Sequence, residues 1–267
     1  MGISDLTIAV LALNTLLGLA LPIGLLLILR KKTGCSVMPF FAGCVTFVLF
    51  VVVLESFVHS LVLTGPFGQK IWETPWLYAL YGGLAAGLFE ETGRLMAMKL
   101  LIKKDPRPAV SLMYGAGHGG IEVLLVLGLT MAQNLVYALM LNAGQMEAIL
   151  ASVPEAQAQV LASGLQSLAV TPTWMFLLSP LERVIALVLH MGLSVLVWRA
   201  VTQKGKFHFY FAAIGVHALV DAAAVLLQQY GVSVLVIEAV MAAMDVALVF
   251  WVRSIYRDMS QTQEITE

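Results

Sequence analysis

Long apolar runs recur along the whole chain, and they constrain its fold more than any other feature of the sequence. A helix that crosses a bilayer needs roughly 20 mostly apolar residues. Only 12% of the residues are charged, against about 25% in soluble globular domains. The pattern predicts an all-α, polytopic transmembrane helical bundle that forms a single integral membrane domain over residues 1–267, with no separate soluble domain.

We expect seven membrane spans, at roughly 3–29, 37–63, 76–102, 109–141, 173–199, 208–230 and 232–254. The first run has no basic residue before it and no small-residue cleavage site after it, so we expect a membrane helix there and not a cleaved signal peptide. The connection over residues 142–172 is moderately polar and rich in Ala and Gln. This composition predicts an amphipathic helix in the extracytoplasmic loop, at the outer surface.

The Lys and Arg residues are distributed unevenly between the two sides of the expected bundle. Basic residues concentrate in the cytoplasmic loops of membrane proteins. If the N-terminus lies outside, the inner segments hold most of the 15 Lys and Arg residues, namely Arg30, Lys31, Lys32, Lys99, Lys103, Lys104, Arg107, Arg199, Lys204, Lys206, Arg253 and Arg257. The asymmetry predicts an outer N-terminus and an inner C-terminus in a multi-pass protein of a cell membrane, with a prokaryotic plasma membrane as the expected location.

The remaining composition excludes two other classes of site. Cys35 and Cys44 lie near the start of the second span and form neither a disulfide framework nor a CxxC-type metal motif. No basic patch carries interleaved aromatic residues, so we expect no nucleic-acid partner. The lipid bilayer is the first expected partner.

The stretch LFEETGRLMAM, residues 88–98, places three ionisable groups inside an apolar run. A charged side chain at the centre of a membrane helix costs about 2.5–3.5 kcal/mol on insertion scales. Glu90 and Arg94 are spaced i, i+4, which predicts an ion pair between them. Glu91 points about 100° away from that face, so a local salt bridge explains one carboxylate and leaves the other open.

Other expected spans carry similar groups. His118 and Glu122 are spaced i, i+4, as are His217 and Asp221. Counting 1.5 Å per residue from the cytoplasmic ends places these groups roughly 12–18 Å deep, to within about 8 Å, at one level. That level holds Glu90, Glu91, Arg94, His118, Glu122, His190, His217, Asp221 and Asp245. A shared depth on several helices predicts one site near the bilayer midplane.

Each of these groups also has a structural interpretation. An ion pair can lock one helix, and a histidine can clamp two helices together by a hydrogen bond. We interpret Glu182 and Arg183 as a structural pair, because adjacent opposite charges neutralise each other on burial. Glu55 and His59 are interpreted as an interfacial pair near the outer boundary.

Two kinds of hydrolytic chemistry fit the predicted site, and both stay open. In the first, Glu90 or Glu91 is a general base that activates water for attack on a peptide carbonyl; His217 with Asp221, or Arg94, stabilises the oxyanion. In the second, His118, Glu122 and His217 ligate Zn²⁺, and one of the two glutamates acts on the metal-bound water. The residue types suit zinc, although HxxxE and HxxxD are not the HExxH signature of zincins.

Three motifs carry a resemblance to a known family: EETGR at 90–94, HGGIE at 118–122 and HALVD at 217–221. In this order on successive helices they resemble the YhfC family of intramembrane peptidases. That family is in turn similar to the wider superfamily of CPBP proteases, PrsW-type proteases and CaaX prenyl endopeptidases. The resemblance covers roughly residues 3–255. The second motif departs from the superfamily pattern, because His118 stands where those families show Phe.

The resemblance implies roles for individual residues. Glu90 or Glu91 activates water, and His217 and Asp221 stabilise the oxyanion or ligate a metal. The candidate catalytic residues are Glu90, Glu91, His118, Glu122, His217 and Asp221, supported by Arg94, Glu182, Arg183 and His190. The role of the last three supporting residues does not follow from the sequence.

We therefore expect an intramembrane peptidase that hydrolyses peptide bonds of a peptide or membrane-protein substrate, with zinc as the cofactor if a metal is used. Two other functions fit the same residues. Chains of His and carboxylate groups at the midplane also serve proton- or metal-coupled transporters. A non-catalytic immunity or binding protein could keep the same site without turnover.

Overall fold

The computed structural model describes residues 2–102 and 104–264, and this part of the chain is helical without a β-strand. Lys103, one of the basic residues predicted on the inner side, lies outside the described residues. The elements are α1 (Asp5–Thr33), α2 (Met38–Phe47), η1 (Val48–Glu55), α3 (Ser56–Leu63), α4 (Gly68–Glu73), α5 (Pro75–Ala97), η2 (Met98–Ile102), α6 (Ala109–Glu122), η3 (Val123–Leu129), α7 (Thr130–Asn142), α8 (Met146–Ala151), α9 (Glu155–Val170), α10 (Thr173–Thr202), α11 (His208–Gln229) and α12 (Val234–Glu264). The three η elements are π-helical segments. The all-α fold class is confirmed.

Six helices in the described part are long and apolar enough to cross a membrane: Asp5–Thr33, Met38–Leu63, Ala109–Asn142, Thr173–Thr202, His208–Gln229 and Val234–Thr262. Each coincides with a predicted span. The seventh predicted span, residues 76–102, is helical as α5 and η2. It is not among the six described helices that are long and apolar enough to cross a membrane. Glu90, Glu91 and Arg94 lower its hydropathy, so this helix needs partners for its charges before it can be buried.

The described chain divides into two compact units. The first combines Met1–Ile23 with Glu122–Val184, and the second combines Gly24–Ile121 with Ile185–Glu267. In the first unit, Asn14 donates a hydrogen bond from Nδ2 to the Phe176 carbonyl oxygen at 2.6 Å. The predicted loop helix at 142–172 is present as two helices, α8 and α9.

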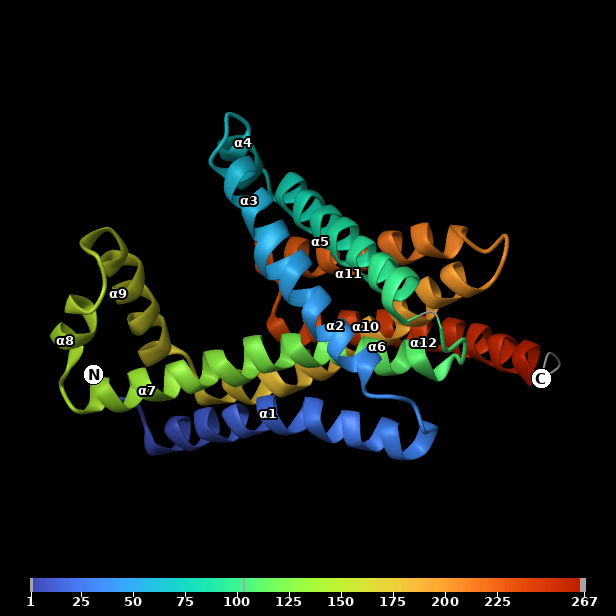
Figure 1. The fold of residues 1–267 in the computed structure, drawn as a ribbon. Coiled ribbons are helices and arrows are strands. Elements are labelled where there is room, and N and C mark those ends of the chain that lie inside the picture. Colours follow the sequence, from blue (N-terminus) through green and yellow to red (C-terminus); the bar gives the residue numbers. More distant parts are fainter. Residues whose placement is uncertain (1, 103, 265–267) are drawn as a thin grey trace. The chain divides into compact units, whose positions relative to one another are not determined.

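The second unit holds its helices together by close backbone contacts at glycines. Figure 1 shows α5 and α11 side by side, and a Cβ built on Gly83 of α5 would lie 2.3 Å from the Ala218 carbonyl oxygen of α11. On α6, Gly115 faces the backbone of Met191 on α10, with 2.7 Å from a built Cβ to Cα. Small residues at helix contacts let backbones approach closely in membrane proteins. These contacts join α5 to α11 and α6 to α10, and these four helices carry most of the predicted site residues.

Gly117 of α6 is the tightest of these positions. A Cβ there would lie 1.9 Å from the carbonyl oxygen of Phe40 in α2, and a backbone atom cannot move aside as a side chain end can. We expect Gly117→Ala to destabilise the protein by about 1–3 kcal/mol through overpacking. Gly82→Ala is the matched control, because a Cβ on Gly82 of α5 meets nothing within 4 Å. The measurement is thermal unfolding of both variants in detergent, followed by circular dichroism; an equal loss in the two would contradict the packing.

Candidate active site

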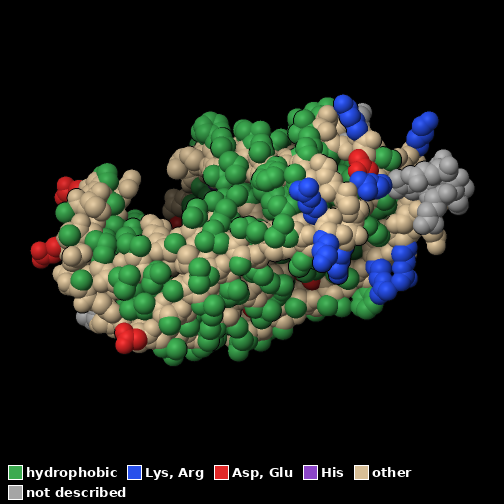
Figure 2. All heavy atoms as spheres, turned by 60° about the horizontal axis from the view of Figure 1, so that its bottom comes forward, with side chains coloured by type: hydrophobic (Ala, Val, Ile, Leu, Met, Phe, Trp, Pro, Cys, Tyr) green, Lys and Arg blue, Asp and Glu red, His purple; other side chains and the backbone are tan. Residues whose placement is uncertain are grey.

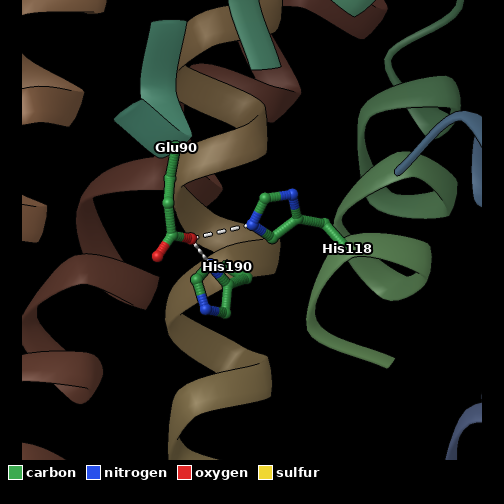
Figure 3. Close-up of side chains that lie close together, drawn as sticks. All are labelled: Glu90, His118 and His190. Carbon is green, nitrogen blue, oxygen red and sulfur yellow. Dashed lines mark hydrogen bonds and ion pairs between the residues drawn. The ribbon is translucent and has the colours of Figure 1, made fainter. Parts of the chain in front are cut away.

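Glu90 lies at the centre of a buried group of side chains from separate helices. Its Oε2 is 2.8 Å from Nε2 of His118 on α6 and 3.8 Å from Nδ1 of His190 on α10. Figure 3 shows both rings turned toward the Glu90 carboxylate, which descends from α5. All three residues are buried, with His118 fully so. One carboxylate therefore meets two histidines in a space closed to bulk water.

His217 of α11 lies near the other oxygen of the Glu90 carboxylate. Its Nε2 is 3.9 Å from Oε1 of Glu90, and its Nδ1 makes a 2.8 Å hydrogen bond with Oε1 of Glu91. Nε2 also lies 3.5 Å from Oδ2 of Asp221, whose side chain is 37% exposed. Glu91 holds the ring at one nitrogen, so that only the other nitrogen faces Glu90. Asp221 marks the more open edge of the group.

Arg94 pairs with Glu91 and not with Glu90, which corrects the prediction of an i, i+4 ion pair. Its Nε is 2.9 Å from Oε2 of Glu91, and both side chains are fully buried. The guanidinium NH1 group donates to the His190 carbonyl oxygen at 2.8 Å and to the Ser194 hydroxyl. Positions i+3 and i+4 both face residue i on a helix, and the α10 acceptors decide which carboxylate the guanidinium meets. Glu90 is left facing the histidines.

The group of Glu90, His118 and His190 fits a metal ion. Their ligand atoms lie within 4.8 Å of one another, and imidazole nitrogen with carboxylate oxygen is the donor set that catalytic zinc sites use. Nδ1 of His118 is buried and has no hydrogen-bond partner in the part of the chain that the structure describes. A hydrogen bond to Glu90 alone therefore does not satisfy this ring.

This group differs from the predicted metal set of His118, Glu122 and His217. Glu122 belongs to the first unit, where its Oε1 is 2.5 Å from NH1 of Arg183. Arg183 also pairs with Glu182. Glu122, Arg183 and Glu182 are thus linked by ion pairs within the first unit. His190, whose role did not follow from the sequence, is the second histidine of the Glu90 group, and the set of His118, Glu122 and His217 stays a prediction.

Glu55 is a further acid that sequence reasoning assigned elsewhere. It is buried at the end of η1, and its Oε1 is 3.2 Å from Nε2 of His59. Nδ1 of His59 in turn lies 2.8 Å from the Tyr81 hydroxyl. Glu55 thus forms a polar chain with His59 and Tyr81. Its position in a π-helical segment is a signal, since such segments occur often at functional sites, but a sequence does not reveal it.

Comparison with known proteins places this chain in a family. A family model described as YhfC intramembrane metalloprotease matches residues 17–242, which is most of the chain. The chain belongs to the YhfC family. It is also 35% identical over 255 residues to the uncharacterized membrane protein YhfC of Bacillus subtilis (strain 168), covering 94% of this chain and 96% of that protein. No solved structure matches.

The YhfC match includes all three motifs and every residue of the Glu90 group. The predicted resemblance to this family is therefore confirmed, and a YhfC relative of nearly the same length is itself described as a membrane protein. Kinship with the CPBP and PrsW proteases stays a prediction. A buried Glu–His–His group that can hold a metal agrees with a family described as metalloproteases.

The Arg94–Glu91 pair should dominate the stability of this YhfC protein. Removing one partner of a buried pair leaves an uncompensated charge and costs about 3–5 kcal/mol, so Arg94→Ala should be strongly destabilised. Lys99→Ala is the matched control, because Lys99 is an exposed cation in η2, the segment that follows α5. This variant should change the free energy of unfolding by no more than about 0.5 kcal/mol. Urea unfolding in mixed micelles measures both. Equal stability of the Arg94 and Lys99 variants would contradict the ion pair.

Proposed function

We propose that this protein is an intramembrane peptidase that hydrolyses peptide bonds of membrane-associated substrates at the Glu90 group. The observation that carries the proposal is the meeting of one carboxylate and several histidines from separate helices in a buried space. Burying so many ionisable groups is costly, and intramembrane ionisable residues are functional by default. The family description supports peptide hydrolysis as the use of these groups.

In this proposal the enzyme is a metallopeptidase, and the resident ion is zinc. His118, His190 and Glu90 would hold it, because their donor atoms are close together and of the types that zinc prefers. The ion would supply Lewis-acid polarisation and lower the pKa of a water molecule. Burial of the three ligands keeps bulk water from competing for the site.

Glu90 is the glutamate that acts on the water. Glu91 is held on both oxygens, by Arg94 at Oε2 and by His217 at Oε1, and so it is not placed to take a proton. Glu90 directs Oε2 toward His118 and His190, whereas its Oε1 faces His217 across 3.9 Å. Oε1 accepts the proton of the water as its oxygen attacks the peptide carbonyl. Glu90 then returns this proton to the leaving amine nitrogen, which balances the hydrolysis.

His217 and Asp221 form the substrate side of the proposed site. Because Nδ1 of His217 is bound to Glu91, only Nε2 is available to the substrate. A doubly protonated His217, which the carboxylates of Glu91 and Asp221 would stabilise, donates from Nε2 to the oxyanion that develops on the carbonyl oxygen, as donors in oxyanion holes do. Asp221 orients the ring from the more exposed edge, where a peptide segment can enter. Glu122, Arg183 and Glu182 enter the proposal as a structural ion-pair cluster.

We place the whole chain in the membrane as a single integral domain with an outer N-terminus and an inner C-terminus. On the face that Figure 2 shows, hydrophobic side chains are spread over much of the surface, and the Lys and Arg side chains gather at one end. Such gathering supports a cytoplasmic side, since basic residues concentrate there. A prokaryotic plasma membrane is the proposed location.

The test compares Glu90→Gln with Glu182→Gln in the full chain, purified and reconstituted in liposomes. A mixture of membrane-spanning reporter peptides is the substrate, and mass spectrometry detects cleavage products. Glu90→Gln should lose at least about 100-fold in cleavage rate, because it removes the proposed general base and replaces a carboxylate ligand of the proposed metal site. Glu182 is a half-exposed glutamate paired with Arg183, so its glutamine variant should cleave at the wild-type rate.

Two results would overturn the proposal. The first is a folded Glu90→Gln variant that cleaves as fast as the wild type. The second is a wild-type protein that cleaves no reporter peptide but carries protons or metal ions across the liposome membrane, with the flux lost in Glu90→Gln, which would favour the transporter alternative.

A further inference from the structure

Two arginines of α12 carry positive charges that no carboxylate of the described chain neutralises. Arg253 and Arg257 are exposed, and in the described part of the chain neither guanidinium forms an ion pair or a hydrogen bond. Asp258, the adjacent carboxylate, is 2.7 Å from NH2 of Arg199 on α10. Both arginines belong to Val234–Thr262, a helix apolar enough to cross a membrane, and like charges spaced i, i+4 repel each other. An anion beside them would relieve this repulsion.

The same two arginines line an apolar groove between α10 and α12. The groove has a volume of about 480 Å³. Its apolar walls include Val188, Gly192, Val195, Val249 and Val252. A second hollow, of about 520 Å³, shares Arg253 and Arg257 and adds the polar side chains of Ser254, Asp258 and Gln261. The two charges thus lie where an apolar groove meets a polar surface, as a phosphate group does between the chains and the headgroup of a phospholipid.

The groove follows the two helices from the interior of the span toward its basic end. Gly192 of α10 faces Leu248 of α12, with a Cβ built on the glycine 2.8 Å from the leucine Cδ2. The Arg199–Asp258 pair lies further along both helices, so α10 and α12 run parallel here. The arginines of the groove therefore lie at the end that also carries Arg199, which the sequence predicts on the inner side.

The dimensions of the groove suit a hydrocarbon chain better than a helix. From Val188 to Val195 the α10 wall rises about 10 Å, against roughly 15 Å for the hydrocarbon of one leaflet. A volume of about 480 Å³ over that length leaves a cross-section of roughly 50 Å². A helix with its side chains is about 10–12 Å across and needs roughly 80–110 Å². An extended acyl chain is the narrower occupant.

We propose that this groove binds an anionic phospholipid, with an acyl chain between α10 and α12 and the phosphate on Arg253 and Arg257. Guanidinium groups form strong charge-assisted hydrogen bonds with phosphate oxygens, and basic pockets between membrane helices bind anionic lipid headgroups. Two guanidinium groups would repel the cation of a choline headgroup, so the site selects for net negative charge. Among the described residues the groove shares none with the Glu90 group, and the inference therefore does not depend on the proposed hydrolysis.

The experiment titrates the full chain in detergent with phosphatidylglycerol, and separately with phosphatidylcholine of the same acyl chains, and counts bound lipids by native mass spectrometry. The wild type should bind the first phosphatidylglycerol at least about 10-fold more tightly than phosphatidylcholine. The double variant Arg253→Gln/Arg257→Gln should raise the Kd for phosphatidylglycerol by about 25-fold, because each basic residue contributes about a factor of five. Lys31→Gln/Lys32→Gln is the matched control, since it removes two exposed cations at the end of α1, and it should bind as the wild type does.

A second variant tests the apolar part of the site. Val249 lines the groove and is 42% exposed, so Val249→Trp fills the groove from its open side and keeps both arginines. It should raise the Kd for phosphatidylglycerol at least about fivefold, because the acyl chain loses packing contacts. Val246→Trp is the control, since Val246 is an exposed residue of the same helix that is not part of the groove lining, and it should bind as the wild type does.

Three results would overturn the inference. The first is a wild type that binds the two lipids equally, and the second is a folded Arg253→Gln/Arg257→Gln variant that binds phosphatidylglycerol as tightly as the wild type. The third is a wild-type dimer that Val249→Trp dissociates, which would assign the groove to a second copy of the chain. Equal melting temperatures of all variants without added lipid should show that the substitutions change binding and not folding.

Discussion

The buried ion pair between Arg94 and Glu91 is the interaction on which the rest of the site depends. A carboxylate and a guanidinium without solvent exposure are stable only if each finds the other and the remaining donors find acceptors. Arg94 meets this condition by bonding to Glu91 on its own helix and to the His190 carbonyl oxygen and Ser194 hydroxyl on α10. The pair therefore neutralises a charge and joins α5 to α10 at the same point.

Fixing Glu91 has consequences for the adjacent residues. Its second oxygen holds Nδ1 of His217, and the orientation of that ring turns Nε2 toward Glu90. Glu90, one residue along, faces His118 and His190 instead of the arginine. The two neighbouring glutamates thus have different partners and different roles, because a helix turns by about 100° from one residue to the next. One is a structural anion, and the other is the carboxylate in the proposed reaction.

Much of the fold follows from the sequence, and the site follows in part. Apolar runs predicted helices at all seven spans, and depth counting grouped Glu90, His118 and His217, because rise per residue is fixed within a helix. The partner of Arg94 did not follow, since i+3 and i+4 share a face and acceptors on α10 decide between them. Glu122 was grouped with His118 by the same spacing, yet it pairs with Arg183. His190 had no motif partner, and its place depends on packing between helices, which spacing along one helix does not encode.

The central claim is that Glu90, His118 and His190 together hold a catalytic metal ion, and X-ray absorption spectroscopy of the purified protein tests it most directly. Protein prepared without chelators should contain about one zinc ion per chain, with a coordination shell of nitrogen and oxygen at about 2.0–2.1 Å and the outer scattering of two imidazole rings. A protein that contains no metal and takes up none, or one whose zinc is coordinated by sulfur from Cys35 or Cys44, would contradict the claim.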